Sequence, residues 1–296
     1  METGSGAQTS MAGKTVVVTG GNAGIGEETA LALARRGARV IFTARNPARG
    51  AAALSGLRER SGSELVELVD LDLASLASVR ACADELRRRC PTIDVLINNA
   101  GLMLSRRAET ADGLEMTLGV NHFGHFALTL RLVDRLVAGG GGRVVVVASD
   151  AHRLARAFDF DDLHARRRYS GMKAYSQSKL ANVLFARELA ARLDGRGVTV
   201  NALHPGLVRS SFAGGGDVSG AFAAFFALCA RVGGISSAKG AQTSVHLACS
   251  PEVALTTGEY FYRCAPRRPA AAAQDAEAAR RLWELSEALT GERLER

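Results

Sequence analysis

The sequence predicts an α/β fold, a doubly wound parallel sheet of about seven strands with helices on both faces. Short β-branched runs alternate with stretches typical of helices over most of the 296 residues. Glycine, with 32 residues, and other small residues are abundant, as close packing of helices against a parallel sheet requires. The first β-branched run leads directly into a glycine-rich turn. The chain is long enough for one domain with a full hydrophobic core.

The expected strands are separated by segments long enough to hold a helix. We predict strands at residues 14–19, 39–43, 65–69, 94–97, 143–148 and 198–204. A first helix is expected at residues 27–36, and a long helix carrying Asn121 is expected to begin near Gly113. Alternation of this kind favours a single open sheet over separate domains.

The glycine-rich turn follows the first strand. Gly20 permits a tight turn, Gly24 lets the backbone approach a phosphate, and Gly26 lets strand and helix pack closely. The next helix offers free N–H groups and the positive end of its dipole at its N-terminus. Strand, glycine turn and helix in this order indicate a Rossmann-type, dinucleotide-binding domain.

Tyr175 and Lys179 carry the clearest chemical signal. Residues four apart share one face of a helix, and Lys179 is one of only four lysines among 37 basic residues. An ammonium stabilises a nearby phenolate, so we expect the pKa of Tyr175 to fall toward neutrality. The phenol could then transfer a proton at physiological pH. The alternative is a solvated polar pair on an amphipathic helix.

These motifs resemble the short-chain dehydrogenase/reductase superfamily, whose glycine turn has the spacing Thr-Gly-x-x-x-Gly-Ile-Gly. The resemblance covers about residues 13 to 290. Its further motifs, in the family's order, are Asp72-Leu73, Asn98-Asn99-Ala100-Gly101, Asn121, Ser149, Tyr175 with Lys179, and Pro205-Gly206. Other stretches resemble the retinol-dehydrogenase-like branch, namely residues 37–41, 149–152, 178–185, 204–206, 258–261 and 282–286.

The resemblance implies a role for each matching residue. Tyr175 would be the general acid in reduction and the general base in oxidation, and Lys179 would lower its pKa and hold the nicotinamide ribose. Ser149 would stabilise the substrate oxygen, and Asn121 would tie a water to Lys179. Structural alternatives are that Asn121 distorts its helix and Ser149 caps a turn. The implied cofactor-binding residues are Gly20, Asn22, Gly24, Ile25, Gly26, Arg45, Asp72, Leu73, Asn99, Ala100, Gly101, Tyr175, Lys179, Pro205, Gly206 and Val208.

The end of the second strand favours NADP(H) over NAD(H). An enzyme of this architecture that uses NAD usually has a carboxylate there to bind the ribose hydroxyls. This chain has Ala44 at that position, followed by Arg45. A guanidinium can pair bidentately with a 2′-phosphate, whereas the alternative for Arg45 is one more surface arginine.

We expect one catalytic domain at residues 13–296 after a flexible leader at residues 1–12, in which Met11 is an alternative start. The segment at about 207–239 is expected to form a lid over the substrate, because ligands bind at the carboxyl ends of parallel strands. Its apolar content suggests a hydrophobic carbonyl or alcohol, although the same side chains could pack the lid against the core. Its phenylalanines are Phe212, Phe222, Phe225 and Phe226. Residues 159–168 are expected to form another wall.

The predicted function is therefore an NADP-dependent dehydrogenase/reductase of the EC 1.1.1 type. A 3-oxoacyl-thioester reductase is an alternative, because the arginine clusters at residues 87–89, 166–168 and 267–268 could bind an acidic carrier protein. Further alternatives are a non-catalytic NADPH-binding regulator and a protochlorophyllide-reductase-like enzyme. Several cysteines would be expected near the substrate of the latter, and only Cys229 falls in the lid.

Composition points away from several other classes. The net charge of +7 comes with no interleaved aromatic pattern, so we expect no nucleic-acid partner. Five cysteines, odd in number, are typical of a reducing cytoplasm. No membrane anchor or signal peptide is expected, nor is a metal, because His122, His125 and His152 lack a recognisable ligand spacing. A homo-oligomer, dimer or tetramer, is expected from the resemblance.

Overall fold

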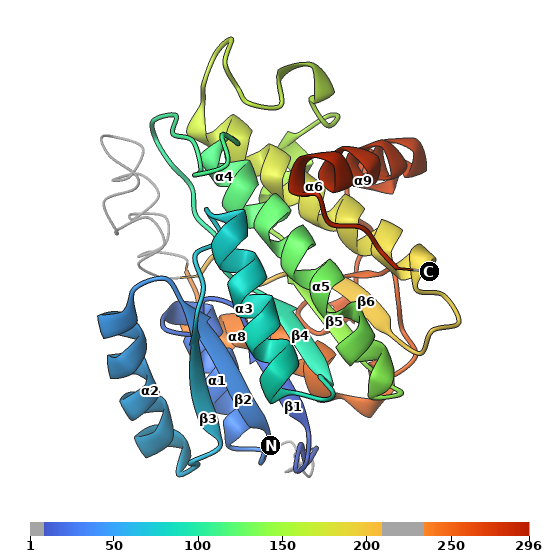
Figure 1. The fold of residues 1–296 in the computed structure, drawn as a ribbon. Coiled ribbons are helices and arrows are strands. Elements are labelled where there is room, and N and C mark those ends of the chain that lie inside the picture. Colours follow the sequence, from blue (N-terminus) through green and yellow to red (C-terminus); the bar gives the residue numbers. More distant parts are fainter. Residues whose placement is uncertain (1–8, 209–233, 296) are drawn as a thin grey trace.

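The computed structural model describes residues 9–208 and 234–295. Eight strands form one sheet in the order β3-β2-β1-β4-β5-β6-β7-β8 (Figure 1). Their bounds are β1 Thr15–Val18, β2 Arg39–Ala44, β3 Val66–Asp70, β4 Val95–Asn98, β5 Arg143–Val147, β6 Thr199–His204, β7 Tyr260–Tyr262 and β8 Ala265–Pro266. All neighbouring strands are parallel except β7 and β8, which are antiparallel. The predicted α/β class is confirmed, with a short edge strand, β8, beyond the predicted seven.

Seven of the described helices are longer than two turns. They are α1 Gly24–Ala34, α2 Pro47–Ser61, α3 Leu76–Arg89, α5 Gly124–Ala138, α6 Gly171–Arg192, α8 Ser237–Cys249 and α9 Ala276–Thr290. The short ones are α4 Met116–Leu118, the π-helical turn η1 Gly119–Phe123, and the 3-10 turns η2 Asp150–Leu154, η3 Phe160–Asp162, η5 Pro251–Val253 and η6 Ala271–Gln274. None of the helices in the described ranges is long and apolar enough to cross a membrane.

Alternate residues of each central strand face opposite layers of helices. Val16 and Val18 pack in a core with α1 and α8, whereas Val17 packs in a second core with α3, α5, α6 and α9. This period of two is what a strand buried on both faces requires, and it explains the continuous apolar runs in the sequence.

The strand order changes direction between β1 and β4. The strands β2 and β3 lie on the β1 side of this point, and β5 to β7 lie on the β4 side. The connections that leave β1 and β4 diverge at this point, so a crevice opens beyond the carboxyl ends of the strands. In open α/β sheets, ligands bind in this crevice, so the ligand-binding site is expected here.

The helix that carries Asn121 differs from the prediction. It begins at Met116 rather than near Gly113, because the Glu115 carboxylate caps its start by accepting the N–H groups of Thr117 and Leu118 at 2.9 and 2.7 Å. One π-helical turn, η1, then precedes α5. The six strands whose bounds were predicted, in contrast, begin and end within one residue of those bounds, whereas β7 and β8 were not located in the sequence.

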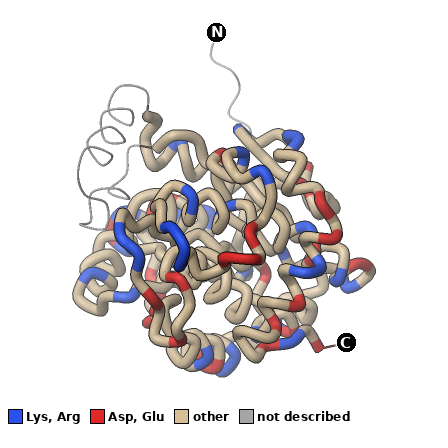
Figure 2. The backbone as a smooth tube through the Cα atoms, turned by 90° about the horizontal axis from the view of Figure 1, so that it is seen from above, with Lys and Arg blue, Asp and Glu red and all other residues tan. Residues whose placement is uncertain are grey.

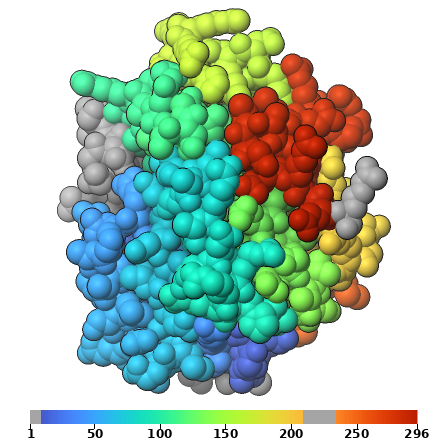
Figure 3. All heavy atoms as spheres, in the orientation of Figure 1, coloured from blue at the N-terminus to red at the C-terminus, as the bar shows by residue number. Residues whose placement is uncertain are grey.

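The two ends of the chain are packed into the domain as far as they are described. Met11, predicted to belong to a flexible leader, is 5% exposed in the core with α1, and its N–H donates to the Arg36 carbonyl at 2.8 Å. Met11 therefore belongs with the domain, and residues 1–8 lie outside the described part. Near the other end, Glu292 binds Arg80 at 2.9 Å. Figure 3 shows α9, in red, against α3, in cyan.

The predicted lid lies mostly outside the described residues. Residues 209–233, which hold its four phenylalanines and Cys229, are not described. Of the remainder, Val208 pairs with Ile235 in a parallel bridge, and residues 237–239 form the first turn of α8. Basic and acidic residues are interspersed along the described backbone (Figure 2). Several arginines of the predicted clusters have carboxylate partners, as Arg87 does in Asp134 at 2.6 Å.

Candidate active site

One cleft of about 880 Å³ lies at the carboxyl ends of the strands. It brings together almost all of the residues singled out in the sequence, which are Gly20, Asn22, Gly24, Ile25, Gly26, Arg45, Asp72, Leu73, Asn99, Ala100, Gly101, Ser149, Tyr175, Lys179, Pro205, Gly206 and Val208. Asn121 is the exception, and its neighbour Val120 lines the cleft instead. Residues so far apart in sequence meet because most of them follow the end of a strand or begin the next helix, whereas Tyr175 and Lys179 reach the cleft from within α6.

The glycine turn forms one end of the cleft and is shaped for a phosphate. Gly20 and Gly24 have φ angles of +64° and +58°, which side chains disfavour. A Cβ on Gly26 would lie 2.3 Å from the Gly20 carbonyl oxygen, so only glycine allows α1 to approach this closely. Ala23 at the start of α1 makes no side-chain cap. The N–H groups of the first turn are thus available to an anion, and the turn fits a dinucleotide pyrophosphate.

Asn99 and Thr19 hold this end of the cleft together. The Asn99 side chain donates to the Thr19 carbonyl at 2.8 Å, and the Thr19 hydroxyl accepts the N–H groups of Asn99 and Ala100 at 2.9 and 3.0 Å. Asp72 accepts the N–H of Ala74 at 3.0 Å and so shapes the turn before α3. These contacts hold in place the backbone that a cofactor would meet. Thr19 is the first residue of the glycine motif, but these hydrogen bonds were not predicted for it.

Arg45 and Ala44 lie at the end of β2, as the sequence suggested. Ala44 is 1% exposed and adds no charge, whereas Arg45 is exposed at the rim of the cleft. Asn46 directs its side chain away to cap α2, accepting the N–H of Arg49 at 3.0 Å. No carboxylate therefore ends this strand, and the charge at this edge of the cleft is positive.

Tyr175, Lys179 and Ser149 form the other end of the cleft. Ser149 follows β5, and Tyr175 and Lys179 lie on α6 with the Lys179 Nζ 5.6 Å from the centre of the Tyr175 ring. Lys179 is 3% exposed and donates to the Val147 carbonyl at 3.0 Å. The Ser149 hydroxyl accepts the N–H of Ala151 at 3.2 Å. Ser149 thus caps its turn and also reaches the phenol.

The electrostatics of Tyr175 differ from the prediction. Burial raises its pKa to about 12, and the hydrogen bond with Ser149, which lowers the pKa, is the smaller effect. Burial also lowers the pKa of Lys179 to about 8. The expected fall of the Tyr175 pKa under the influence of Lys179 is therefore wrong for this arrangement. The reason is that desolvation penalises both charged forms, and the ammonium lies over the ring.

The Asn121 side chain is hydrogen-bonded to Leu102 and Ser178. Its side chain pairs with both backbone groups of Leu102, accepting the N–H at 2.8 Å and donating to the carbonyl at 2.9 Å. It also donates to the Ser178 hydroxyl at 2.9 Å. The side chain is thus used in joining the Gly101–Leu102 segment to α6. Asn121 also sits in a π-helical turn, which is a local distortion of the helix of the general kind that the structural alternative described.

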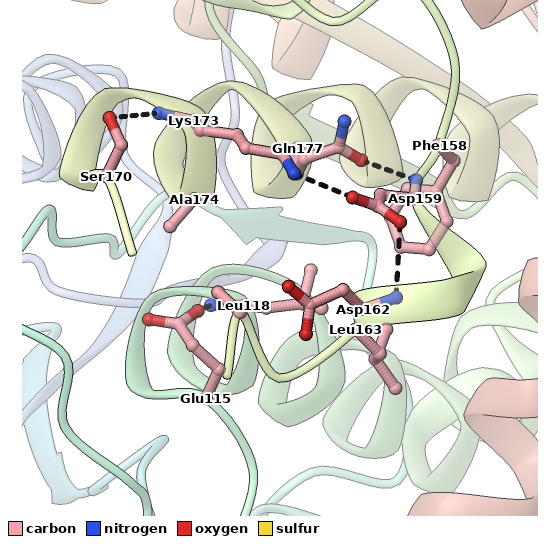
Figure 4. A pocket seen from close by; sticks show the side chains of 11 residues that line it. Glu115, Leu118, Phe158, Asp159, Asp162, Leu163, Ser170, Lys173, Ala174 and Gln177 are labelled. Carbon is pink, nitrogen blue, oxygen red and sulfur yellow. Dashed lines mark hydrogen bonds and ion pairs between the residues drawn. The ribbon is translucent and has the colours of Figure 1, made fainter. Parts of the chain in front are cut away.

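The segment at residues 159–168, expected to form a wall, does not line the cleft. It lies instead against the first turns of α6 around a separate small pocket (Figure 4). Asp159 binds Lys173 at 2.7 Å, and its N–H donates to Gln177 at 3.0 Å. Ser170 caps the helix by accepting the N–H of Lys173 at 3.4 Å. This segment therefore braces the start of the helix that carries Tyr175.

Several lining residues were missed in the sequence. Near Tyr175 the cleft is lined by mostly apolar side chains, namely Leu102, Met103, Leu154, Met172, His204, Leu207 and Tyr262. The His204 and Tyr262 rings stack with centres 4.7 Å apart. The signal that could have found some of them is their place immediately after strands that end at the cleft. No group of His, Cys, Asp or Glu in the described ranges is arranged to hold a metal.

The family profile described as short chain dehydrogenase matches residues 14–215. The chain belongs to this family of oxidoreductases. Mouse Retinol dehydrogenase 14 is 43% identical over 292 residues, which cover 95% of this chain and 87% of that protein. Within the family, the chain belongs to the retinol-dehydrogenase-like branch.

Solved structures agree with the fold. An uncharacterized protein from Mycobacterium paratuberculosis has a TM-score of 0.78 and 38% identity, with 98% of each chain covered. An NAD(P)-dependent gluconate 5-dehydrogenase from Beutenbergia cavernae, solved with bound NADP, has a TM-score of 0.68 and 29% identity, covering 86% of this chain and 96% of that one.

Proposed function

We propose that the protein is an NADP(H)-dependent oxidoreductase that interconverts a carbonyl and an alcohol on a hydrophobic small molecule. The observation that carries this proposal is the convergence of Ser149, Tyr175 and Lys179 at one end of a cleft whose other end is a phosphate-binding glycine turn. A bound nicotinamide would supply or accept the hydride. The chain's own residues would orient the substrate and handle the proton.

Reduction is the direction that the site favours. A phenol with a pKa of about 12 carries its proton at neutral pH, so Tyr175 is ready to donate it to a carbonyl oxygen. Ser149 would donate its hydroxyl hydrogen to the same oxygen as negative charge develops there. Lys179, with a pKa of about 8, exchanges protons with solvent readily near neutral pH and could restore the phenol. Oxidation would need the phenolate, which burial disfavours.

The preference for NADP(H) is supported by charge. Arg45 at the rim of the cleft could pair with the 2′-phosphate, and Ala44 offers the ribose hydroxyls of NAD no acceptor. The relative from Beutenbergia cavernae, solved with bound NADP, supports the same choice. We assign the adenosine end of the cofactor to Arg45, Asp72 and Leu73 and its pyrophosphate to the glycine turn.

The substrate class is supported by the lining near Tyr175. Leu102, Met103 and Met172 are apolar, and an apolar wall favours a hydrophobic aldehyde or ketone. The mouse relative is named for retinol, itself an apolar alcohol. We therefore place retinaldehyde among the first carbonyls to test, together with shorter aliphatic and aromatic aldehydes.

The test is a titration of the purified protein with NADPH and NADH, followed by a panel of carbonyls with the preferred cofactor. We expect tight NADPH binding and turnover of a hydrophobic aldehyde or ketone. Turnover of a carrier-bound ketone but not of any free one would favour the thioester-reductase alternative. Binding of neither nucleotide would contradict the proposal. Size-exclusion chromatography with light scattering would test the proposed dimer or tetramer.

A further inference from the structure

Two buried histidines, His125 and His152, have the same hydrogen-bonding pattern. In each ring, Nδ1 contacts the backbone carbonyl of a predicted site residue and Nε2 contacts a second group. His152, 0% exposed, points its Nδ1 at the backbone carbonyl of Ser149, 2.7 Å away. His125, 2% exposed, points its Nδ1 at the backbone carbonyl of Asn121, 3.1 Å away. A carbonyl oxygen can only accept, so Nδ1 carries a hydrogen in both rings.

The second ring nitrogen of His152 must be unprotonated. Its Nε2 accepts the backbone N–H of Ala270 at 3.0 Å, and a backbone N–H can only donate. His152 is therefore a neutral imidazole with its hydrogen on Nδ1 and both nitrogens satisfied. Through this ring the carbonyl of Ser149 is tied to a segment more than a hundred residues later in the chain.

His125 reaches the same state through Thr19. The Thr19 hydroxyl oxygen already accepts two backbone N–H groups, from Asn99 and Ala100. Its own hydrogen is therefore free to go to the His125 Nε2 at 2.8 Å, a shorter contact than the 3.3 Å to the Ile97 carbonyl. A continuous chain of hydrogen bonds thus runs from the backbone of Asn99 and Ala100 through Thr19 and His125 to the Asn121 carbonyl.

We propose that His125 and His152 are positioning residues that hold Asn121 and Ser149 in place, each as a neutral imidazole with its hydrogen on Nδ1. This inference rests on the proposed function for its consequence in turnover. His152 fixes the turn from which the Ser149 hydroxyl points, and His125 fixes the π-helical turn and links it to the glycine-turn end of the cleft. Neither ring lines the cleft.

Further contacts fasten the turn that carries Ser149 to the C-terminal part of the chain. Arg153 donates to the Arg268 carbonyl at 2.7 Å, next to the bond between His152 and Ala270. The His152 ring also packs edge-on against Tyr260 at 5.0 Å between centres. The Ser149 hydroxyl must meet a substrate oxygen at hydrogen-bond distance, and a displacement of about 1 Å can lower a rate by about 100-fold.

The test compares the same substitution at three buried histidines. His122 is the matched control, because it is 1% exposed and binds the Ser286 hydroxyl at 2.9 Å but contacts neither carbonyl. We expect His152→Phe and His125→Phe to lower kcat by about 100-fold and His122→Phe to leave it near the wild-type value. His152→Asn, whose amide can still donate to the Ser149 carbonyl, should recover most of the loss. Equal losses at all three positions, or no loss at His152 and His125, would overturn the proposal.

A second variant leaves the histidine itself unchanged. Ala270 has a φ angle of −60°, which proline also adopts. Ala270→Pro removes the N–H that the His152 Nε2 accepts, and the ring Cδ, which takes the place of the hydrogen, pushes the imidazole away from this anchor. We expect a lower kcat with unchanged NADPH affinity, whereas Ala270→Ser, which keeps the N–H, should behave as wild type. Wild-type turnover of Ala270→Pro would contradict the role of this anchor.

A measurement without turnover separates this proposal from the proposed function. In protein labelled with 15N in its histidine rings, His125 and His152 should each show one protonated and one unprotonated nitrogen, with the hydrogen on Nδ1. A charged ring or the opposite tautomer at either position at neutral pH would overturn the proposal even in an active enzyme. If the wild-type protein turned over no carbonyl while the spectra agreed, the proposed function would fail and the assigned hydrogen bonds would stand.

Discussion

The Tyr175 hydroxyl shows how burial and charge compete at a single residue. A nearby ammonium is expected to lower the pKa of a phenol, yet Lys179 is itself buried and its pKa falls to about 8. Desolvation then dominates at Tyr175 and raises its pKa to about 12. Under the proposed function, the phenol would give its proton to the substrate and the lysine could replace it.

Replacement of the proton donor should separate chemistry from binding. We expect Tyr175→Phe to lower kcat by about 10²- to 10⁴-fold, the usual contribution of general acid catalysis, with NADPH affinity unchanged. Tyr169→Phe is the matched control, because Tyr169 donates to the Leu104 carbonyl at 3.0 Å and does not line the cleft. Steady-state kinetics and a binding titration of both variants provide the measurement. Turnover of Tyr175→Phe near wild type would remove Tyr175 from the mechanism.

The pH dependence should report Lys179 rather than Tyr175. Its ammonium is charged below a pKa of about 8 and lost above it, so we expect kcat/KM for NADPH to fall as the pH rises through about 8. Unfolding would not explain this fall. A lysine whose pKa is lowered on folding makes the folded state more stable as the pH rises through that range. If kcat/KM for NADPH stayed constant up to about pH 10, two units above the pKa of Lys179, this would contradict the assignment of the pH dependence to Lys179.

Under the proposed function, the preference for NADPH over NADH depends on one exposed side chain, that of Arg45. We expect Arg45→Ala to raise KM for NADPH by about 10- to 100-fold, the value of a charge-assisted hydrogen bond, and to leave KM for NADH nearly unchanged. Arg88→Ala is the control, because Arg88 is exposed on α3 and pairs with Glu85 away from the cleft. Equal effects of Arg45→Ala on both cofactors would show that Arg45 does not contact the 2′-phosphate.

At the scale of elements, the irregular helix around Asn121 is held by a buried cap. Glu115, 2% exposed, accepts two N–H groups at the start of α4, and the π-helical turn follows directly. Without this carboxylate the two N–H groups would be buried and unpaired. The cap thereby fixes where the helix begins and the direction in which Asn121 faces.

Removal of this cap should lower stability. We expect Glu115→Ala to reduce the free energy of unfolding by about 0.5–2 kcal/mol, as loss of a helix cap usually does. Urea denaturation monitored by circular dichroism provides the measurement, and Glu284→Ala, on the exposed side of α9, is the control. Similar unfolding curves for Glu115→Ala and the wild type would show that the cap does not stabilise the helix.

At the scale of the whole molecule, the C-terminal helix closes one face of the domain. Trp283 of α9 is 2% exposed and packs edge-on against Phe126 of α5, with ring centres 5.0 Å apart. The Arg192 guanidinium covers the indole at 4.4 Å from its centre. Since α6 carries Tyr175 and Lys179, and the π-helical turn with Asn121 leads into α5, α9 stabilises the layer of helices next to the candidate site.

We expect Trp283→Ala to lower the free energy of unfolding by about 3–5 kcal/mol, because it would leave a cavity between α9 and the two helices. Leu255→Ala, at a side chain that is 93% exposed, is the control and should change little. Thermal and urea unfolding of both variants test this. A small effect of Trp283→Ala would mean that α9 packs only loosely on α5 and α6.

The amino-acid sequence by itself determined the α/β class, the strand positions and the place of the glycine turn. These features are local, because β-branched runs, glycines at required φ angles and helix periodicity each act over a few neighbouring residues. Most of the predicted residues now seen to line the cleft were selected because they match the family's motifs, and many of them also follow the end of a strand. Asn121 was selected by resemblance, and its position beside the cleft rather than in it came only from the fold.

Only the tertiary structure decided the electrostatics and the supporting contacts. The pKa of Tyr175 depends on how deeply α6 is buried, and spacing along a helix does not encode burial. The bonds from Thr19 to His125 and from Ala270 to His152 join segments about a hundred residues apart. Such contacts exist only after the sheet has brought strand ends together, so the chain specifies them through the fold as a whole rather than through any local pattern.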